Sequence, residues 1–328
     1  MKAILQNNYG SAKTLYIGVV NQPIITEYQV LVKIHSTALN RADILQREGK
    51  YHPPKGESEI LGLEMAGEIV EIGKNVKNLK IGQRVAGLLG GGGYAEYAAI
   101  HSDMVFQIPD YLSFVEAAAI PEVFMTAYDA LFAQLNFQKG EAILVHAGAS
   151  GVGTAAIQLA KLFGASSIFV TASKNKHSIC SDLGADVTID YKNEDFEKII
   201  LEKTNGKGVN TIIDFLAAAY FQQNINCLSM DGRAVILGML GGYKMKETNL
   251  IPILKKRLTI KGATLRNRDL HYKINLIKRV GELLPHFKSG ELKPVIDTVY
   301  NWKDVTAAHE RMEKNQNIGK IILEINDL

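Results

Sequence analysis

The chain contains 328 residues, which favours about two domains over one. Hydrophobic residues make up 47% and charged residues 22% of the sequence, and these values exclude a disordered chain, a collagen-like repeat and a small disulfide scaffold. The 37 Lys and Arg against 34 Asp and Glu leave a net charge of +3, which indicates no strongly charged partner. The two cysteines, Cys180 and Cys227, cannot form a disulfide framework or a four-ligand zinc site.

We do not expect the beginning of the chain to act as a signal peptide. Its first apolar run covers only residues 3–5, which is too short for the core of a signal peptide. No run of about 18 apolar residues predicts a membrane helix. We therefore expect a cytoplasmic protein without membrane contact.

The first 120 residues or so are predicted to form a compact, mostly-β module. Short β-prone runs alternate there with turn signals such as Pro-Pro-Lys-Gly at 53–56 and four glycines at 90–93. The expected strands are residues 3–6, 30–35, 65–72, 84–88 and 94–100. From Val115 the residue pattern becomes helical.

From Gly140 onward, strands and helices alternate. The expected strands are residues 142–146, 168–171, 187–189, 211–215 and 234–237, and the expected helices are residues 154–163, 176–183, 195–203 and 220–228. This alternation predicts βαβ units and a parallel sheet covered on both faces. The tail from Leu270 is expected to hold an amphipathic helix and two strands, at 295–299 and 320–325.

The most informative local feature is the run 144–154, in which a strand leads into a glycine-rich turn and then into a helix. Backbone N–H groups at such a helix N-terminus can hold a pyrophosphate. Gly148 and Gly153 match the outer glycines of the dinucleotide fingerprint, while Ser150 replaces the middle glycine and Gly151 follows it. Since a Ser hydroxyl can also donate to a phosphate, we predict a dinucleotide-binding turn. The alternative is that these glycines serve packing alone.

The end of the next strand indicates which dinucleotide binds. An NAD site needs a carboxylate about 20 residues after the glycine turn, where it binds the ribose hydroxyls. Residues 172–176 read Ala-Ser-Lys-Asn-Lys, with no carboxylate. Lysines attract a 2′-phosphate that a carboxylate would repel, so NADPH is the predicted cofactor. A solvated helix start is the alternative reading of these lysines.

Motifs of other protein classes are incomplete. Residues 148–152 end in Val where a hydrolase nucleophile elbow needs Gly, and no Gly-Lys pair continues into the Ser or Thr of a P-loop. Nine Lys or Arg and one acid lie between Lys255 and Arg279, either as a solvated helix face or as a contact for RNA. Only Tyr272 could supply an aromatic platform there, so nucleic acid is not expected as the main partner.

Several runs in combination resemble quinone oxidoreductases of the medium-chain dehydrogenase/reductase superfamily. They are Ala-Leu-Asn-Arg-Ala-Asp at 38–43, Leu-Gln-Arg-Glu-Gly-Lys-Tyr at 45–51, Leu-Gly-Leu-Glu at 61–64, the turn at 146–153, Asp-Tyr-Lys at 190–192 and Asn-Ile-Gly-Lys at 317–320. The resemblance implies an α/β fold with a GroES-like, β-rich catalytic domain from residues 1–122 and 268–328. It also implies a Rossmann domain with a doubly wound parallel sheet from residues 123–267, which would bind NADPH.

The resemblance further implies a zinc-free enzyme. Zinc-dependent members of the superfamily place Cys at the position of Asn40 and His at the position of Leu63. Without a Lewis acid, alcohol oxidation loses its activator, whereas an electrophilic quinone or conjugated carbonyl needs less help. We therefore expect no metal site.

The cofactor-binding residues come from the same resemblance. Ser150, Gly151 and Val152 would contact the phosphates, and Ser173, Lys176 and Tyr191 would surround the 2′-phosphate. The other implied cofactor-binding residues are Tyr51, Gly148, Gly153, Phe215, Leu216, Gly238, Met239, Leu240, Leu265, Arg266 and Asn317. For Phe215 and Leu216, burial in a strand is the alternative.

Tyr51, Asn40 and Asp43 are the predicted catalytic residues. Tyr51 precedes a proline turn and would lie beside the nicotinamide, although a packed loop aromatic is the alternative. The proton could come from Tyr51 or from solvent. We predict a homodimeric, NADPH-dependent quinone reductase. The alternatives are a 2-alkenal or enone reductase, and an NADPH-stabilised RNA-binding protein.

Overall fold

The computed structural model describes residues 1–245 and 247–325, and the chain folds into two compact units. The first unit contains Met1–Met125 and Arg266–Leu328, and the second contains Thr126–Leu265. The domain limits predicted from the sequence, at 122/123 and 267/268, fall beside the limits of these units. Arg266 belongs to the first unit and not to the predicted cofactor domain.

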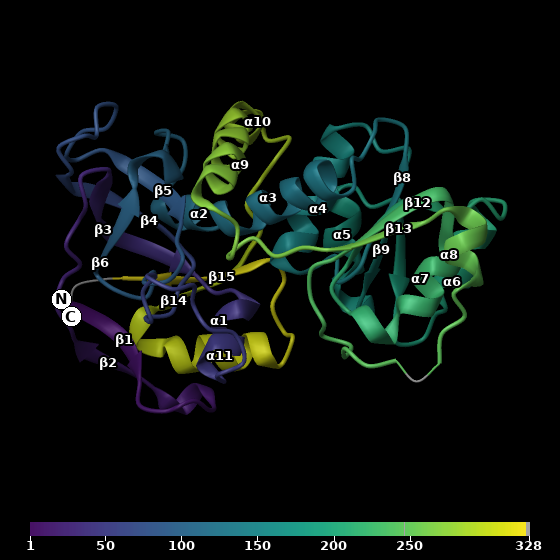
Figure 1. Ribbon diagram of the computed structural model, residues 1–328, viewed down its shortest axis with the longest axis horizontal. Helices are drawn as coiled ribbons and strands as arrows, with labels where there is room; N and C mark the ends of the chain where they lie inside the picture. The colour runs from purple at the N-terminus through teal and green to yellow at the C-terminus, as the bar shows by residue number, and fades with distance from the viewer. Residues whose placement is uncertain (246, 326–328) are drawn as a thin grey trace. The chain divides into compact units, whose positions relative to one another are not determined.

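The first unit is built on a mostly antiparallel sheet with strand order β14-β15-β3-β4-β5-β7, in which β6 also pairs with β3. These strands are β3 (Gln29–Ala38), β4 (Glu64–Ile72), β5 (Arg84–Leu88), β6 (Tyr97–His101), β7 (Val105–Gln107), β14 (Ile296–Asn301) and β15 (Lys320–Glu324). A separate hairpin pairs β1 (Lys2–Gln6) with β2 (Leu15–Val19). Strand β15 pairs antiparallel with β3, so the end of the chain completes the sheet begun by its first third (Figure 1).

Helices cover and connect the strands of the first unit. They are α1 (Arg41–Arg47), α2 (Phe114–Ala118), α9 (Leu270–Glu282), α10 (Leu284–Ser289) and α11 (Val305–Glu313), while α3 (Pro121–Tyr128) runs across the limit of the unit. Helix α1 begins where the Asp43 carboxylate accepts the N–H of Asn40, at 2.7 Å. Such a contact satisfies a donor that the helix itself leaves unpaired. Helix α1 therefore starts at Arg41, with only Leu39 and Asn40 between it and the end of β3.

The second unit is a parallel sheet with strand order β10-β9-β8-β11-β12-β13. Its strands are β8 (Ala142–Val145), β9 (Ser167–Ala172), β10 (Val187–Asp190), β11 (Val209–Asp214), β12 (Leu228–Ile236) and β13 (Thr259–Gly262). Its helices are α4 (Gly151–Leu162), α5 (His177–Leu183), α6 (Phe196–Lys203), α7 (Phe221–Cys227) and α8 (Ile251–Lys256). The strand order reverses between β8 and β11, and ligands of doubly wound folds bind at the carboxyl ends of strands at such a point.

The predicted α/β architecture is confirmed, with differences at element ends. The strand predicted at 94–100 begins only at Tyr97, because the N–H of Tyr94 bonds to the Leu61 carbonyl in a loop. The helix predicted at 154–163 begins at Gly151, because the Ser150 hydroxyl accepts the N–H of Gly153 as an N-cap. The sequence reading missed β2, β7, β13 and the helices α1, α8, α10 and α11.

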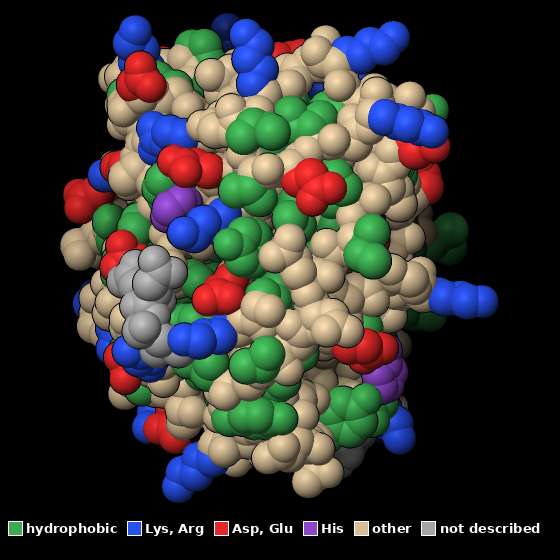
Figure 2. All heavy atoms as spheres, turned by 90° about the vertical axis from the view of Figure 1, so that its left-hand side faces the viewer, with side chains coloured by type: hydrophobic (Ala, Val, Ile, Leu, Met, Phe, Trp, Pro, Cys, Tyr) green, Lys and Arg blue, Asp and Glu red, His purple; other side chains and the backbone are tan. Residues whose placement is uncertain are grey.

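Charges are mixed over the visible surface. Figure 2 shows a face of the molecule on which acidic and basic side chains are interspersed among hydrophobic ones, without a large field of one sign. None of the helices in the described part of the chain has the length and apolar character needed to cross a membrane.

Candidate functional site

The glycine turn of the second unit has the close packing that a dinucleotide-binding turn requires. A Cβ atom at Gly148 would lie 2.0 Å from Val170 Cγ1, and one at Gly153 would lie 2.5 Å from the Ala147 carbonyl oxygen. Only glycine fits at either position. Ser150 caps α4, and the first N–H groups of such a helix lack partners within it. The N-terminus of α4, at Gly151 and Val152, therefore offers hydrogen-bond donors and a positive dipole end to an anion.

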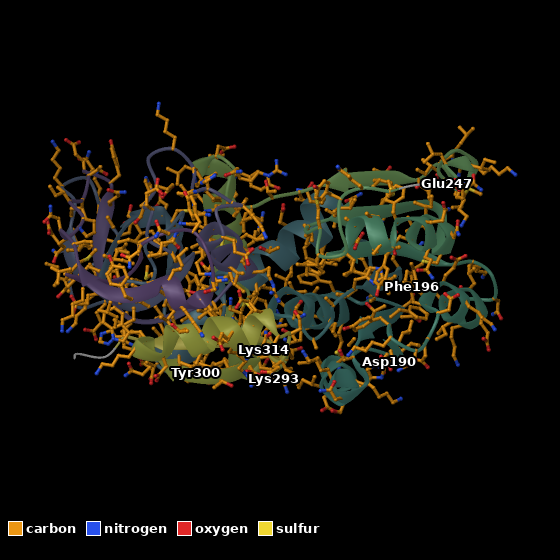
Figure 3. All side chains as sticks on the ribbon, turned by 90° about the horizontal axis from the view of Figure 1, so that it is seen from below. Asp190, Phe196, Glu247, Lys293, Tyr300 and Lys314 are labelled. Carbon is orange, nitrogen blue, oxygen red and sulfur yellow. The ribbon has the colours of Figure 1, made fainter. Side chains whose placement is uncertain are left out.

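The segment after β9 has the donors expected around a 2′-phosphate. The Ser173 hydroxyl donates to the Tyr191 phenol oxygen at 3.4 Å, so the structure brings these two predicted residues together. Lys176 lies on the same turn, where its N–H bonds to the Ser173 carbonyl. Asp190, labelled in Figure 3, is the nearest carboxylate in sequence to Tyr191, but its oxygens accept donors from Lys192 and Asn193 of its own turn.

The segments after β11 and β12 are joined by backbone hydrogen bonds. The N–H of Leu240 bonds to the Phe215 carbonyl at 2.9 Å, and the N–H of Gly241 bonds to the Leu216 carbonyl at 3.0 Å. Strand β11 ends at Asp214, so burial in the strand does not account for Phe215 or Leu216. These contacts bring together the predicted residues Phe215, Leu216, Gly238, Met239 and Leu240. Met239 and Leu240 leave more than half of their surface exposed, at 62% and 55%.

Leu265 and Asn317 lie apart from these groups in the chain. Leu265 is half-buried at the end of the second unit. The Asn317 side-chain amide donates to the Gly319 carbonyl at 2.9 Å, within the turn that leads into β15. A cofactor role for either residue stays a prediction.

In the first unit, Asn40 belongs to a buried cluster with Glu64 and Lys320. The Lys320 ammonium donates to the Leu39 carbonyl at 2.8 Å, to Asn40 Oδ1 at 2.7 Å and to Glu64 Oε1 at 2.7 Å. The Asn40 amide nitrogen also donates to Glu64 Oε1, at 2.9 Å. The side chains of Lys320 and Glu64 are 3% and 0% exposed, so the ion pair is shielded from water. The other Glu64 oxygen accepts the N–H of Glu122.

Asp43 is fully buried and binds the backbone of Asn40 and Gly62. Its carboxylate accepts the N–H groups of Asn40 and Gly62, at 2.7 and 2.9 Å, and the Tyr94 hydroxyl at 3.4 Å. Burial raises the pKa of Asp43 to about 6, against the opposing effect of these backbone hydrogen bonds. The contacts assign Asp43 a positioning role, and a direct part in the reaction stays a prediction.

Tyr51 lies beside a fixed guanidinium. The Arg266 guanidinium carbon lies 5.3 Å from the centre of the Tyr51 ring. Arg266 donates from Nε and Nη2 to the Gly90 carbonyl and from Nη2 to Gln46 Oε1, at 2.6–2.9 Å. Its third nitrogen, Nη1, is buried and has no hydrogen-bond partner among the described residues. Burial raises the pKa of the Tyr51 phenol, so the phenol stays protonated at neutral pH.

The donor set of the first unit does not fit a zinc ion. In the described part of the chain, no group of three or more His, Cys, Asp or Glu side chains lies together as a metal site would need. Leu63 is buried at the position where the resemblance places a zinc-binding histidine. The oxygens of Asn40 and Glu64 already accept the Lys320 ammonium. A zinc ion bound to these oxygens would be repelled by the Lys320 ammonium at close range.

Comparison with known proteins places the chain in a family. The family model for the GroES-like domain of alcohol dehydrogenases matches residues 26–110, and that for zinc-binding dehydrogenases matches residues 151–279. A quinone oxidoreductase-like protein 2 homolog from Nematostella vectensis is 34% identical over 301 residues, covering 90% of this chain and 81% of that protein. The chain belongs to the medium-chain dehydrogenase/reductase superfamily. The human synaptic vesicle membrane protein VAT-1 homolog is also similar, with 31% identity over 90% of this chain and 78% of that protein.

Solved structures of the superfamily share the fold and differ in chemistry. The quinone oxidoreductase from Coxiella burnetii superposes with a TM-score of 0.83 at 30% identity, covering 99% of both chains. An NAD-dependent alcohol dehydrogenase gives 0.89 at 29% identity and the CurK enoyl reductase gives 0.86 at 27%, each covering at least 99% of both chains. Fold alone therefore does not choose the substrate or the cofactor.

Sequence reasoning missed Glu64 and Lys320 as site residues and used them only as parts of motifs. Each is a charged residue at the start of a buried strand, β4 and β15, next to apolar residues. Charged side chains are almost never fully buried unless they are paired. A Lys that opens the run Lys-Ile-Ile-Leu could therefore have been flagged, although its partner could not have been named.

The Lys320 cluster leads to a prediction about stability. Lys320→Met removes the ammonium and leaves the Glu64 carboxylate buried without its counter-charge. We expect the free energy of unfolding to fall by about 3–5 kcal/mol, the usual cost of breaking a buried ion pair, as measured by urea denaturation.

Two further variants control for this prediction. Lys314→Met removes an exposed Lys, labelled in Figure 3, that pairs with Glu310 on the surface, and it should change stability by less than about 1 kcal/mol. Adding Glu64→Gln to Lys320→Met should restore part of the loss. Equal effects of Lys320→Met and Lys314→Met would contradict the assignment.

Proposed function

We propose that this oxidoreductase transfers hydride from NADPH to a quinone without a metal ion. The observation that carries the proposal is the Lys320 ammonium, which occupies the Asn40 and Glu64 oxygens at the place where zinc-dependent relatives are expected to bind metal. A substrate that is already electrophilic, such as a quinone, needs no Lewis acid. The similarity to quinone oxidoreductase-like proteins supports the same substrate class.

The second unit supplies the groups that would hold NADPH. Ser150, Gly151 and Val152 at the N-terminus of α4 would bind the pyrophosphate. Ser173, Lys176 and Tyr191 would bind the 2′-phosphate, because hydroxyl and ammonium donors suit its charge. The remaining cofactor residues of the proposal are Tyr51, Gly148, Gly153, Phe215, Leu216, Gly238, Met239, Leu240, Leu265, Arg266 and Asn317.

The first unit supplies the groups that would orient the reaction. NADPH supplies the hydride when it is bound, and the protein aligns and shields the reacting carbon. The Tyr51 ring would stack against a flat ring of the cofactor or substrate. The free Nη1 of Arg266 would donate to an oxygen there, which also satisfies a buried donor that is otherwise unpaired. Hydride transfer to a quinone yields a hydroquinone anion, which would take its proton either from water or from the protonated Tyr51 phenol.

An enone or 2-alkenal reductase is the second candidate. The CurK enoyl reductase has a closely similar structure, and a conjugated carbonyl also presents an oxygen acceptor to Arg266.

An RNA-binding role has less support. Within the basic segment, Arg257 is paired with Asp231 and Arg279 with Glu282, which reduces the charge available to phosphates.

A homodimer in the cytoplasm is part of the proposal. Strand β13 lies at the edge of its sheet and pairs with β12. Between residues 239 and 254 the same unit exposes a group of large apolar side chains, namely Met239, Leu240, Tyr243, Met245, Leu250, Ile251 and Leu254. An open strand edge and exposed apolar side chains each favour association, and we propose association with a second copy.

The first prediction of this proposal concerns cofactor choice. Lys176→Ala removes one charge from the group around the 2′-phosphate, and a charge-assisted contact contributes about 1.5–3 kcal/mol. The dissociation constant for NADPH should rise about tenfold or more, while that for NADH stays unchanged, as measured by fluorescence titration. Lys203→Ala, which removes an exposed charge at the end of α6, is the matched control. Equal losses for NADPH and NADH would show that Lys176 does not contact the 2′-phosphate.

The second prediction separates stacking from proton donation at Tyr51. Tyr51→Phe keeps the ring and should retain most of kcat with quinones, whereas Tyr51→Ala should lose much of it. A phenol that served as the proton donor would instead cost about 10²-fold or more in the Phe variant. The measurement is steady-state NADPH oxidation with ortho-quinones, para-quinones and enals. Wild-type kinetics in both variants would show that Tyr51 is a packed loop residue.

A further inference from the structure

Four buried side chains of the second unit form a continuous series of hydrogen bonds, which we call the His146 chain. Its members are Thr171 in β9, His146 directly after β8, Asn224 in α7 and Asp214 at the end of β11. The Thr171 hydroxyl lies 2.9 Å from His146 Nδ1, and His146 Nε2 lies 2.8 Å from Asn224 Oδ1. The Asn224 amide nitrogen donates to Asp214 Oδ2 at 3.2 Å. All four side chains are at most 3% exposed.

The chemistry of these groups fixes the direction of every bond. The Asp214 carboxylate only accepts, so the Asn224 amide must turn its NH₂ group toward Asp214 and its oxygen toward His146. His146 must then carry its proton on Nε2 and accept the Thr171 hydroxyl on Nδ1. Asn224 is the only member that accepts from a neutral ring on one side and donates to a carboxylate on the other. Its two different ends therefore set the direction of the chain.

Both ends of the His146 chain reach backbone within or directly beside the segments that the proposed function assigns to the cofactor. At one end, Thr171 Oγ1 accepts the N–H of Ala147, which opens the glycine turn. At the other end, Asp214 Oδ1 accepts the N–H groups of Leu216 and Ala217, at 2.7 and 3.2 Å. Ala147 and Ala217 have φ angles of +48° and +54°, a left-handed conformation that alanine rarely adopts. The His146 chain thus bonds to one strained residue in the glycine turn, Ala147, and to one in the segment after β11, Ala217.

We propose that Asn224 is a positioning residue for the dinucleotide, holding the phosphate turn and the segment at 215–217 in one arrangement through the His146 chain. This inference rests on the proposed function of the second unit as the NADPH-binding unit. The ring of His146 lies 4.9 Å from the rings of both Phe196, labelled in Figure 3, and Tyr220, which restricts the plane of the imidazole. Burial also lowers the pKa of His146 to about 4, so the ring stays neutral at working pH.

Other charged groups near α7 are engaged elsewhere. From α6, Glu197 accepts the Asn226 amide, and Asp195, which caps that helix, accepts the Gln223 amide. From α8, the Lys256 ammonium donates to the carbonyls of Ile225, Asn226 and Leu228. The phenol of Tyr220 is a further titratable group near Asp214. Burial raises the pKa of Asp214 to about 6, so its carboxylate is charged above that pH.

The test uses Asn224→Asp, which keeps the shape and replaces the donating NH₂ by an oxygen. While this new carboxyl and Asp214 share one proton, the new group can still donate to Asp214 and accept from His146. When that proton leaves at higher pH, two buried carboxylates repel each other and the chain is broken. Relative to wild type at the same pH, the NADPH dissociation constant should change less than about threefold at pH 6 and rise about tenfold or more at pH 9. The 2′-phosphate of NADPH also titrates with pH, but it does so for both proteins. The ratio of the variant's dissociation constant to the wild-type value at the same pH therefore removes its effect.

Two variants serve as matched controls. Asn226→Asp adds the same charge two residues further along α7, outside the His146 chain, and should leave the NADPH dissociation constant unchanged at both pH values. Thr171→Val removes the hydroxyl between His146 and Ala147 without a large change of shape, and should weaken NADPH binding several-fold at either pH. Thr171→Val also tests the inference if Asn224→Asp does not fold. A wild-type NADPH dissociation constant in Thr171→Val would overturn the inference.

The unfolding temperature of each variant separates positioning from stability alone. If Asn224→Asp lowers the unfolding temperature at pH 9 but keeps the wild-type NADPH dissociation constant, the His146 chain is only structural and the inference is wrong. An NADPH affinity weakened equally at pH 6 and pH 9 would also contradict it. Failure of the wild-type protein to bind any dinucleotide would overturn the proposed function itself, an outcome visible without the variants.

Discussion

The buried ammonium of Lys320 is the interaction on which the first unit depends. A charge shielded from water is costly unless it is paired and fully hydrogen-bonded. Lys320 meets this condition with the Leu39 carbonyl, Asn40 Oδ1 and Glu64 Oε1, which come from two places in the first fifth of the chain. It can do so only because β15 pairs with β3 and returns the end of the chain to the sheet begun by the N-terminal residues. The Lys320 side chain thus links β15, near the end of the chain, to the residues around Asn40.

The same ammonium bears on the chemistry that we propose. Zinc-dependent relatives are expected to use this position for a cation with open coordination sites, which activates an alcohol or a carbonyl. Lys320 instead neutralises Glu64 with a charge that has no free site for substrate. A second cationic group in the unit is Arg266 beside Tyr51, whose buried Nη1 has no hydrogen-bond partner among the described residues. This arrangement suits a substrate that accepts hydride readily and needs only a hydrogen bond to its oxygen.

The second unit shows how polar groups at strand ends can organise a binding turn. The parallel sheet brings β8, β9 and β11 side by side, and the point where the strand order reverses places His146, Thr171 and Asp214 close together. Backbone donors on the strained residues Ala147 and Ala217 are satisfied by these side chains. The glycines at 148 and 153 permit close approach, while the buried polar groups determine one arrangement of the turn.

The parts of the molecule that local patterns encode could be predicted from the sequence. The strand, glycine turn and helix at 142–162 and the alternation of the second unit follow from local periodicity, and they are confirmed. Helix α1 and strand β13 are short and lack a clear pattern, because tertiary packing determines them. The Lys320–Glu64 pair spans 256 residues of sequence and the Arg266–Gln46 bond spans 220. No local pattern identifies partners so far apart in the sequence. The contacts that define the site could therefore be found only from the structure.

A single-turnover experiment tests the central claim most directly. Metal-depleted protein is mixed with stoichiometric NADPH and a quinone, and nicotinamide oxidation is followed with normal NADPH and with NADPH carrying deuterium at the transferred position. We predict complete oxidation without added metal, slower with the deuterated cofactor, because the transferred hydride is the reacting group. Oxidation that begins only after zinc is added, or that occurs with enals but not with quinones, would contradict the account.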